Sequence, residues 1–314
     1  MPSRRYGRIP LRVGGQKTPL LRSRSLLYPV LNFLELPGSR PPTHPVDTGE
    51  AMSAPAESVL RPGPGLAAGL REVALPDAAA QNGKEAGYFL VEDGGTFRQV
   101  RLRGDSRVWE WPGVYEQLVR TLLRGNAPGA LSHMLDRQLR AAGKSAADLR
   151  VIDLGAGNGW MGEELASLGI PMVIGIDSVN AAVLAAERDH PDVYQSYLLL
   201  DMRRLSEAQR DDLMNYDFNC LVCVDALAAD EPAPNAFTEA FNLLAPDGWV
   251  AFHLNAETAE GGRDSRFART VHRMIQSGAM NVATQQRYRH RFTTYGAPLF
   301  HVGVIARKVR DFEP

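Results

Sequence analysis

The sequence has little of what defines several classes of protein. Only two of its 314 residues are cysteines, too few for a disulfide framework or a four-cysteine zinc site. Its longest apolar runs fall short of the ~20 residues that a membrane-spanning helix needs. The 35 basic side chains nearly balance the 36 acidic ones, so no overall field draws the chain to DNA or to an anionic membrane. We therefore expect a globular protein of a reducing compartment, the cytoplasm, with no membrane span.

The first 85 residues differ in composition from the rest. Residues 1–46 hold eight basic side chains and a single acid, Glu35, and residues 37–76 are rich in proline, alanine and glycine. Such a composition buries too little apolar surface to fold alone. We expect residues 1–85 to be a poorly ordered tail and linker. A targeting peptide and a native start at Met52 are the alternatives.

Regular patterns begin near Gly87. The segment 87–103 alternates around an Asp-Gly-Gly turn, which predicts a β-hairpin. Leucines at helical spacing then predict helices over 114–125 and 129–143. We expect a β-hairpin extension over 86–112 that precedes one larger domain.

That domain, residues 113–314, shows an alternation of strands and helices from Arg150 onward. Four strand-and-helix pairs follow one another, and Ser206 and Gln209 predict a capping box at the start of one helix. The last two strand-like segments have no helix between them. This order predicts an α/β fold, a doubly wound and mostly parallel sheet with helices on both faces and a closing antiparallel hairpin at one edge.

The first strand of the alternation ends in an acid and a run of glycines, VIDLGAGNGWMG at residues 151–162. Doubly wound folds bind ligands at this place, where glycines let the backbone approach closely and amides at the helix start favour anionic oxygens. Gly157, Gly159 and Gly162 also fit the dinucleotide pattern G-x-G-x-x-G. Asp153 argues against a dinucleotide, because a carboxylate beside the glycines opposes a pyrophosphate and suits an ammonium or sulfonium group.

At these residues the sequence resembles the class I S-adenosylmethionine-dependent methyltransferases, whose first motif reads acid-x-Gly-x-Gly-x-Gly. The resemblance runs from near Tyr115 to Lys308, and LVCVDAL and LLAPDGWVAF resemble the family's fourth-strand motif and the turn into its fifth strand. It implies that Asp177 takes the ribose hydroxyls and that Asp201 lies near the adenine amine. The cofactor contacts that we expect are Asp153, Gly155, Ala156, Gly157, Gly159, Asp177, Ser178, Asp201, Met202 and Asp225.

The acceptor is less well defined than the cofactor. Methyl transfer is an in-line displacement, so the protein mainly positions the acceptor, and a general base is needed only if the acceptor must first lose a proton. The NPPY-type sequence that the family uses for amino groups of bases and glutamine is missing after strand four, where this chain reads VDALAADEP. No basic cluster interleaved with aromatics marks a nucleic-acid groove. We expect a small-molecule acceptor, methylated at oxygen, nitrogen or a carboxylate.

Several side chains have both a functional and a structural interpretation. His253, late in the fifth strand, and Asp225, at the end of the fourth, are the candidate catalytic residues; a core histidine and a helix cap are their structural alternatives. Trp160 can line the pocket or anchor the core. Cys220 and Cys223 point to opposite faces of an extended strand, so we interpret both as buried fillers and expect no metal.

Three alternative functions stay open. The chain can be a protein or RNA methyltransferase, or an S-adenosylmethionine-binding module that has lost its catalytic activity. A nicotinamide-dependent oxidoreductase is the third, and it would have to hold a pyrophosphate beside Asp153. The sequence defines neither the acceptor atom nor the oligomeric state.

Overall fold

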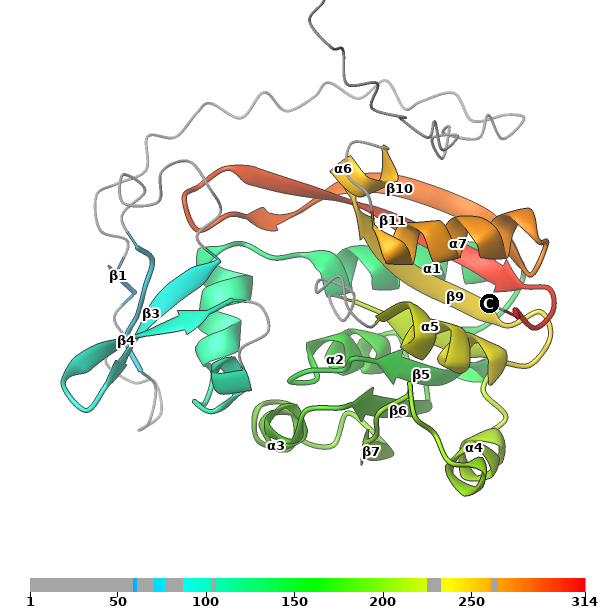
Figure 1. The fold of residues 1–314 in the computed structure, drawn as a ribbon, viewed down its shortest axis with the longest axis horizontal. Helices are drawn as coiled ribbons and strands as arrows, with labels where there is room; N and C mark the ends of the chain where they lie inside the picture. The colour runs from blue at the N-terminus through cyan, green and yellow to red at the C-terminus, as the bar shows by residue number, and fades with distance from the viewer. Residues whose placement is uncertain are drawn as a thin grey trace, which may run out of the picture.

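The computed structural model describes residues 59–60, 71–76, 87–102, 106–224, 233–260 and 265–313. At its centre is a seven-stranded sheet with the strand order β10-β11-β9-β8-β5-β6-β7 (Figure 1). The strands β5 to β9 run parallel, and β11 runs antiparallel to both β9 and β10. The predicted doubly wound sheet with an antiparallel edge hairpin is therefore confirmed. Its strands are β5 (Arg150–Leu154), β6 (Met172–Asp177), β7 (Ser196–Leu199), β8 (Cys220–Cys223), β9 (Trp249–Asn255), β10 (Met280–Phe292) and β11 (Pro298–Lys308).

The strand order reverses at β5. The chain first adds β6 and β7 on one side of β5 and then returns to add β8 and β9 on the other. At such a reversal the two connections leave in opposite directions, and the crevice between them opens at the carboxyl ends of the strands. The glycine-rich loop follows β5 and therefore lies at the carboxyl edge of the sheet where the strand order reverses.

Two apolar cores fill the two faces of the sheet. The central strands are buried on both faces, which accounts for their nearly continuous apolar sequence. Cys220 belongs to one core and Cys223 to the other, so the prediction that they are buried fillers on opposite faces is confirmed. One face is covered by α1 (Ala127–Ala141) and α2 (Trp160–Ser167), and the other by α4 (Glu207–Met214), α5 (Ala233–Asn242) and α7 (Arg266–Gln276).

The helix termini follow the local sequence. Ser206 and Gln209 form the predicted capping box at the start of α4, each accepting the other's backbone amide. α3 (Asn180–Asp189) packs beside β6 and β7. The short α6 (Ala256–Ala259) was not predicted; Asn255 caps it through a bond from the amide of Glu257. One helical turn is too short to produce a periodic pattern.

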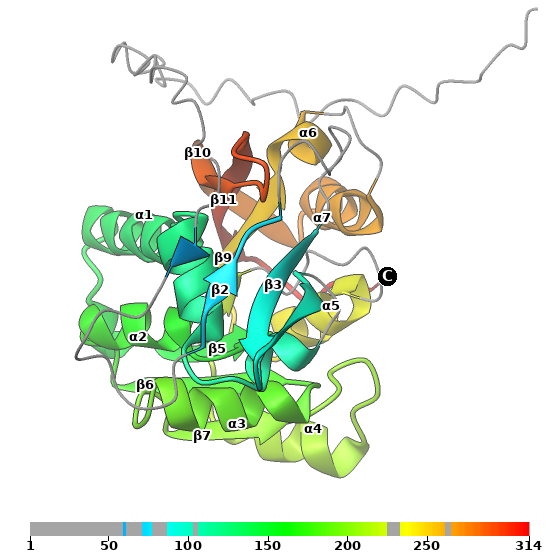
Figure 2. The ribbon, with the colours of Figure 1, turned by 90° about the vertical axis from the view of Figure 1, so that its left-hand side faces the viewer.

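The amino-terminal part of the described chain forms a second, smaller sheet (Figure 2). The predicted hairpin is present and turns at Gly94 and Gly95, which both have positive φ. Most of the predicted tail lies outside the described residues, but two short strands within it extend this sheet. They are too short to show alternation in the sequence. The strands are β1 (Val59–Leu60), β2 (Val73–Ala74), β3 (Tyr88–Asp93) and β4 (Thr96–Arg101).

Two short helical segments link the small sheet to the large one. η2 (Ser106–Trp109) is a 3-10 turn, and η3 (Glu116–Leu122) is a π-helix where the leucine spacing predicted an α-helix. The amide of Leu123 bonds to the carbonyl of Leu118, five residues back. This wider turn brings both leucines to one face, where they are fully buried. Among the described residues, no helix combines the length and the apolar character that a bilayer crossing demands.

Candidate cofactor site

The loop after β5 forms a tight turn at the carboxyl edge of the sheet. Gly155, Gly157 and Gly159 all have positive φ, at 72°, 56° and 96°, a conformation that side chains with a Cβ rarely adopt. The amides of Gly155 and Ala156 both bond to the carbonyl of Ile176, which ties the turn to β6. The glycines are therefore required by backbone geometry, and the turn is a fixed feature of the sheet edge.

Two tyrosines that the sequence analysis did not single out lie against this turn. The hydroxyl of Tyr197 donates to the carbonyl of Gly157 over 2.7 Å, and that of Tyr194 donates to Oδ2 of Asp153 over 2.8 Å. Burial raises the pKa of both phenols above the usual range, and the neighbouring acids raise it further. Both hydroxyls are thus permanent donors. The two rings meet edge to face, with centroids 5.2 Å apart.

The position of the Tyr194 ring explains why residues 162 and 175 are glycines. A Cβ on Gly162 would lie 2.5 Å from Cζ of Tyr194, and one on Gly175 would lie 3.1 Å from Cε1 of the same ring. Gly162 is the last glycine of the G-x-G-x-x-G match. Here it makes room for a tyrosine, so the match does not depend on a dinucleotide. Gly162 lies within a helix and Gly175 within a strand, where glycine is unfavourable. These two glycines were the only local sequence signal for a bulky neighbour.

Asp153, the last residue but one of β5, is almost completely enclosed, with 1% of its surface exposed. Burial raises the pKa of its carboxyl to about 7, against the opposing effect of the bond from Tyr194 and with a further rise from the charge of Asp177. A buried carboxylate of this kind is stabilised by a nearby cation. The position therefore favours a positively charged ligand group.

Asp177 lies between the glycine turn and the start of the next helix. Its Oδ2 accepts the amide of Gly157 over 3.1 Å, and its Oδ1 accepts the amide of Val179 over 2.9 Å. Burial raises the pKa of Asp177, and these backbone bonds oppose the rise. Each carboxylate oxygen retains further acceptor capacity. The carboxylate is half-buried, and the neighbouring Ser178 is exposed.

The other predicted contacts differ in their surroundings. Asp201, in the turn after β7, accepts hydrogen bonds from Nε of Arg203 over 2.6 Å and from Nη2 of the same residue over 2.7 Å. These bonds lower the pKa of the Asp201 carboxyl. The neighbouring Met202 is buried in the core on the α5 side. Asp225 lies outside the described residues, so its position beside the turn stays a prediction.

A segment from the amino-terminal side covers the glycine turn. A Cβ on Gly157 would lie 3.1 Å from Cη2 of Trp109, so the indole packs directly on the turn. The ring of Tyr115 lies 4.5 Å from that indole, centroid to centroid. Arg188, near the end of α3, donates to the carbonyls of Trp109 and Trp111 over 3.2 and 3.3 Å. These contacts hold the covering segment in place.

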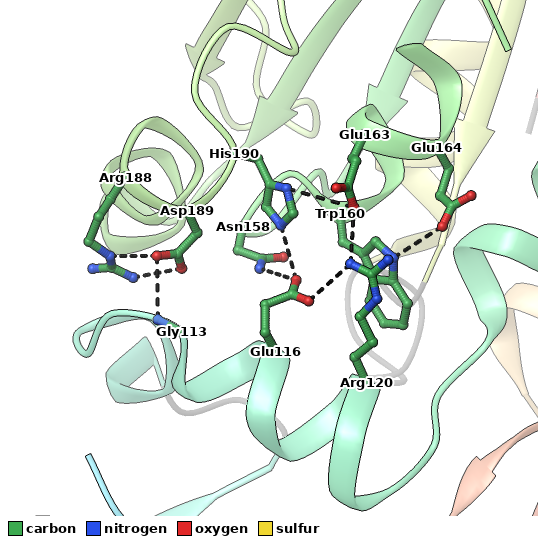
Figure 3. A network of polar contacts seen from close by, with 10 residues as sticks. All are labelled: Gly113, Glu116, Arg120, Asn158, Trp160, Glu163, Glu164, Arg188, Asp189 and His190. Carbon is green, nitrogen blue, oxygen red and sulfur yellow. Dashed lines mark hydrogen bonds and ion pairs between the residues drawn. The ribbon is translucent and has the colours of Figure 1, made fainter. Parts of the chain in front are cut away.

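A polar network anchors the π-helix beside the same turn (Figure 3). Oε1 of Glu116 is 3.0 Å from Nε2 of His190 and accepts Nδ2 of Asn158 over 3.0 Å. Arg120 reaches Glu116 at 3.4 Å and Glu163 of α2 at 3.0 Å. The network thus joins η3, the glycine turn, α2 and the end of α3.

The charges of this network are coupled. Burial would raise the pKa of Glu116, but hydrogen bonds from His190 and Asn158 and the charge of Arg120 outweigh burial and lower it. Burial would lower the pKa of His190, but its bond and charge interaction with Glu116 outweigh burial and raise it. The pair therefore favours a carboxylate facing an imidazolium.

Two further residues that the sequence singled out, Trp160 and His253, are both buried. Trp160 is buried in the core that the small sheet shares with η2 and η3, under the guanidinium of Arg120 at 5.1 Å, which supports its interpretation as an anchor. His253 is buried in β9, two residues beyond Ala251, which is level with Val222 and with Asp153 across the parallel strands. Its Nδ1 lies 2.7 Å from the hydroxyl of Tyr288.

Comparisons with known proteins find distant structural similarity to methyltransferases. No curated protein sequence matches the chain. The magnesium protoporphyrin IX methyltransferase of Synechocystis has a similar structure, with 15% identity, a TM-score of 0.41 and coverage of 56% of this chain and 77% of that one. The N-methyltransferase NodS of Bradyrhizobium japonicum gives 16% identity, a TM-score of 0.41 and coverage of 56% and 85%. Likenesses this distant say nothing about the ligands of this chain.

The family comparison covers more than half of the sequence. A family model described as a methyltransferase domain matches residues 124–302 of the 314. The match begins just after the π-helix and contains the glycine turn, both tyrosines and the β9 histidine. The chain therefore belongs to this methyltransferase family.

Proposed function

We propose that the chain binds S-adenosylmethionine at the glycine turn and transfers its methyl group to a small-molecule acceptor, at oxygen, nitrogen or a carboxylate. Membership of the methyltransferase family supports the reaction class. The observation that carries the cofactor assignment is the pair of carboxylates, Asp153 and Asp177, which meet a turn of positive-φ glycines at the sheet edge. This environment favours a cationic ligand over a diphosphate.

The residues at the turn fit the parts of this cofactor. Asp177 can accept ribose hydroxyls beside its two backbone bonds, and Asp153 acts through its charge on the ammonium group. The proposed contacts also include the backbone of Gly155, Ala156, Gly157, Gly159 and Ser178. Asp201 can accept a hydrogen bond from the adenine amine once Arg203 releases one oxygen of the Asp201 carboxylate. The apolar Met202 is its neighbour in the chain. Asp225 completes the proposed contacts.

When bound, S-adenosylmethionine supplies an electrophilic methyl group on a cationic sulfur. The protein then has to exclude water and hold the acceptor in line. Trp109, which packs on Gly157, and Tyr115, whose ring is tilted by 38° against that indole, would exclude water from the turn. We assign no general base; His253 and Asp225 stay candidates. The acceptor class rests on the sequence after strand four, VDALAADEP.

Calorimetry on the full chain tests the cofactor. We expect saturable binding of S-adenosylhomocysteine and none of NAD. In Asp177→Ala, S-adenosylhomocysteine should bind ~10- to 100-fold more weakly, because hydrogen bonds to a charged group contribute about 1.5 to 3 kcal/mol. Asp212→Ala, in an exposed position of α4, is the matched control and should bind like the wild type. Tight NAD binding without a response to the homocysteine compound would overturn the proposal.

Transfer of a labelled methyl group tests the acceptor. The labelled cofactor is incubated with the protein and with separate metabolite, protein and RNA fractions of a cell extract. We expect label in the metabolite fraction only. Label in the protein or RNA fraction would show that the acceptor is a macromolecule and that the proposed small-molecule acceptor is wrong. Cofactor binding without transfer to any fraction would indicate a binding module that has lost its activity.

Two broader assignments are part of the proposal. We place the chain in the cytoplasm, on the ground of its two cysteines. We also treat residues 86–112 as an extension of the domain at 113–314, because Val91 and Trp160 lie in one shared core.

A further inference from the structure

We propose that His253, His290 and His301 form a binding site for a divalent late transition-metal ion such as Zn²⁺. The inference is independent of the proposed function. The three histidines come from three neighbouring strands, β9, β10 and β11, and each is about 96% buried or more. One ring nitrogen from each residue can be chosen so that all three lie within 4.8 Å of one another.

The register of the strands explains how these side chains meet. In the β9–β11 pair, His253 lies opposite Gly303 and His301 lies opposite Asn255, so the two histidines are diagonal neighbours on one face. His290 lies at a β-bulge of the hairpin, between Arg289 and Arg291. A bulge inserts one residue into the ladder and changes the direction of its side chain.

The neighbouring positions leave room for the cluster. A Cβ on Gly303 would lie 2.9 Å from Sδ of Met134 and 3.3 Å from Cε1 of Tyr288, so a larger residue would displace the groups around the histidines. The rings of His290 and His301 stack with centroids 4.0 Å apart, and that of His253 lies 4.4 Å from His301 and 5.4 Å from His290. Strand register, bulge and glycine together assemble the three rings.

The spacing suits a tetrahedral ion. Two nitrogens bound to Zn²⁺ at ~2.05 Å in tetrahedral geometry lie about 3.3 Å apart. Nδ1 of His253 and Nδ1 of His301 are 3.3 Å apart. The longest separation in the cluster, up to 4.8 Å, exceeds this distance, and the rings of His290 and His301 lie within 14° of parallel, so His290 has to turn out of the stack to direct a nitrogen at the ion. The Tyr288 hydroxyl, 2.7 Å from the same nitrogen of His253, places an oxygen beside the fourth position.

The donor atoms select the kind of ion. Imidazole nitrogens bind zinc, copper, nickel and iron, whereas magnesium and calcium take oxygen ligands. No carboxylate belongs to the cluster found among the described residues. With three protein ligands, the site would hold the ion and one further group. An ion there joins the central strand β9 to the closing hairpin, and it would remove His253 from the candidate bases by occupying its lone pair.

Titration of the chelator-treated full chain with Zn²⁺ tests the inference. We expect one saturable site, and a rise in melting temperature of roughly 5 to 10 °C at 100 times the dissociation constant. In His290→Ala, affinity should fall at least ~10-fold. His133→Ala, on the exposed surface of α1, is the matched control and should keep both the affinity and the rise.

Co²⁺ gives an independent spectroscopic readout. Bound in place of Zn²⁺, it should produce the visible absorption of a tetrahedral nitrogen-ligated ion in the wild type and in His133→Ala, and lose it in His290→Gln. A far-ultraviolet circular dichroism spectrum of metal-free His290→Gln that matches the metal-free wild type would show that the variant is folded. The inference is wrong if neither ion binds saturably, or if binding survives in His253→Ala, His290→Ala and His301→Ala alike, as it would for adventitious surface histidines.

Discussion

The ring of Tyr194 lies where side chains at two glycine positions would otherwise be. It separates Gly162 of α2 from Gly175 of β6 and carries the hydroxyl that bonds to Asp153. One aromatic side chain thus fixes how closely the helix approaches the strand and how the buried acid is oriented. This contact accounts for glycine at both positions without any ligand.

Replacing Gly162 by alanine tests this contact. In a helix without close neighbours the change would stabilise the protein by up to ~1 kcal/mol. Here the new methyl group would overlap the Tyr194 ring, so we expect a loss of ~1 to 3 kcal/mol in the free energy of unfolding, measured by urea denaturation. The double variant Gly162→Ala/Tyr194→Ala should lose less than the sum of the two single changes. Strict additivity would show that the ring does not restrict position 162.

The raised pKa of Asp153 makes stability depend on pH. The folded-state pKa of about 7 exceeds the ordinary aspartate value of 3.8, so the charged form is disfavoured on folding. This cost is absent below about pH 4, grows as pH rises toward 7 and is complete above 7. Asp153→Asn should therefore be more stable than the wild type at pH 8, by roughly 2 to 4 kcal/mol, and equal to it near pH 4. A constant difference in urea denaturation at both pH values would contradict this.

At the scale of elements, the π-helix η3 depends on groups from three other parts of the chain. Its Glu116 meets His190 from the end of α3 and Asn158 from the glycine turn, and its Arg120 meets Glu163 of α2. The pKa of His190 is raised, so this contact stabilises the folded state fully below the histidine's ordinary value near 6.5. The stabilisation is lost as pH rises through the raised value.

We therefore expect His190→Gln to loosen η3 at low pH more than at high pH. Hydrogen exchange of the amides of residues 106–123 should be faster in the variant than in the wild type at pH 6. The difference should shrink at pH 9, once exchange rates are corrected for pH. His133→Gln, at an exposed position, is the control and should match the wild type at both pH values. Equal acceleration at both would show that packing, not charge, holds the segment.

The elements also differ in how far the sequence predicts them. The alternation after Arg150 is sufficient for the order of strands and helices, because each carries its own periodicity and its own terminal signals. The π-turn of η3 was not predicted, because it depends on burying Leu118 and Leu123 in a core shared with distant strands. Tyr194 and Tyr197 were missed for the same reason. Their roles arise from contacts across the sheet edge, and only the glycines opposite them are visible locally.

At the scale of the whole molecule, Trp160 connects the two sheets. It begins α2 in the large sheet's layer, yet its ring packs in the core of the small sheet with Val91 and Leu118. Its Nε1 donates to Glu164 over 3.3 Å, so the polar edge of the ring is satisfied within its own helix. One side chain therefore contributes to two packing units.

Removing this ring should affect the two units unequally. We expect Trp160→Ala to cost about 3 to 5 kcal/mol of stability, as for other large buried aromatics. Amides of β3, β4 and η3 should lose hydrogen-exchange protection before those of β5 and β6, because only the former depend on the shared core. The stability of Trp160→Phe, which keeps an aromatic ring, should lie between that of the wild type and that of Trp160→Ala. A uniform loss across both sheets would mean that they unfold as one unit.

The shared family region begins at residue 124, whereas Trp109, Tyr115 and Glu116 precede it. The segment that covers the glycine turn therefore lies in sequence that the family model does not match. In the proposed reaction, an acceptor that reaches the turn would have to pass side chains that the family model does not cover.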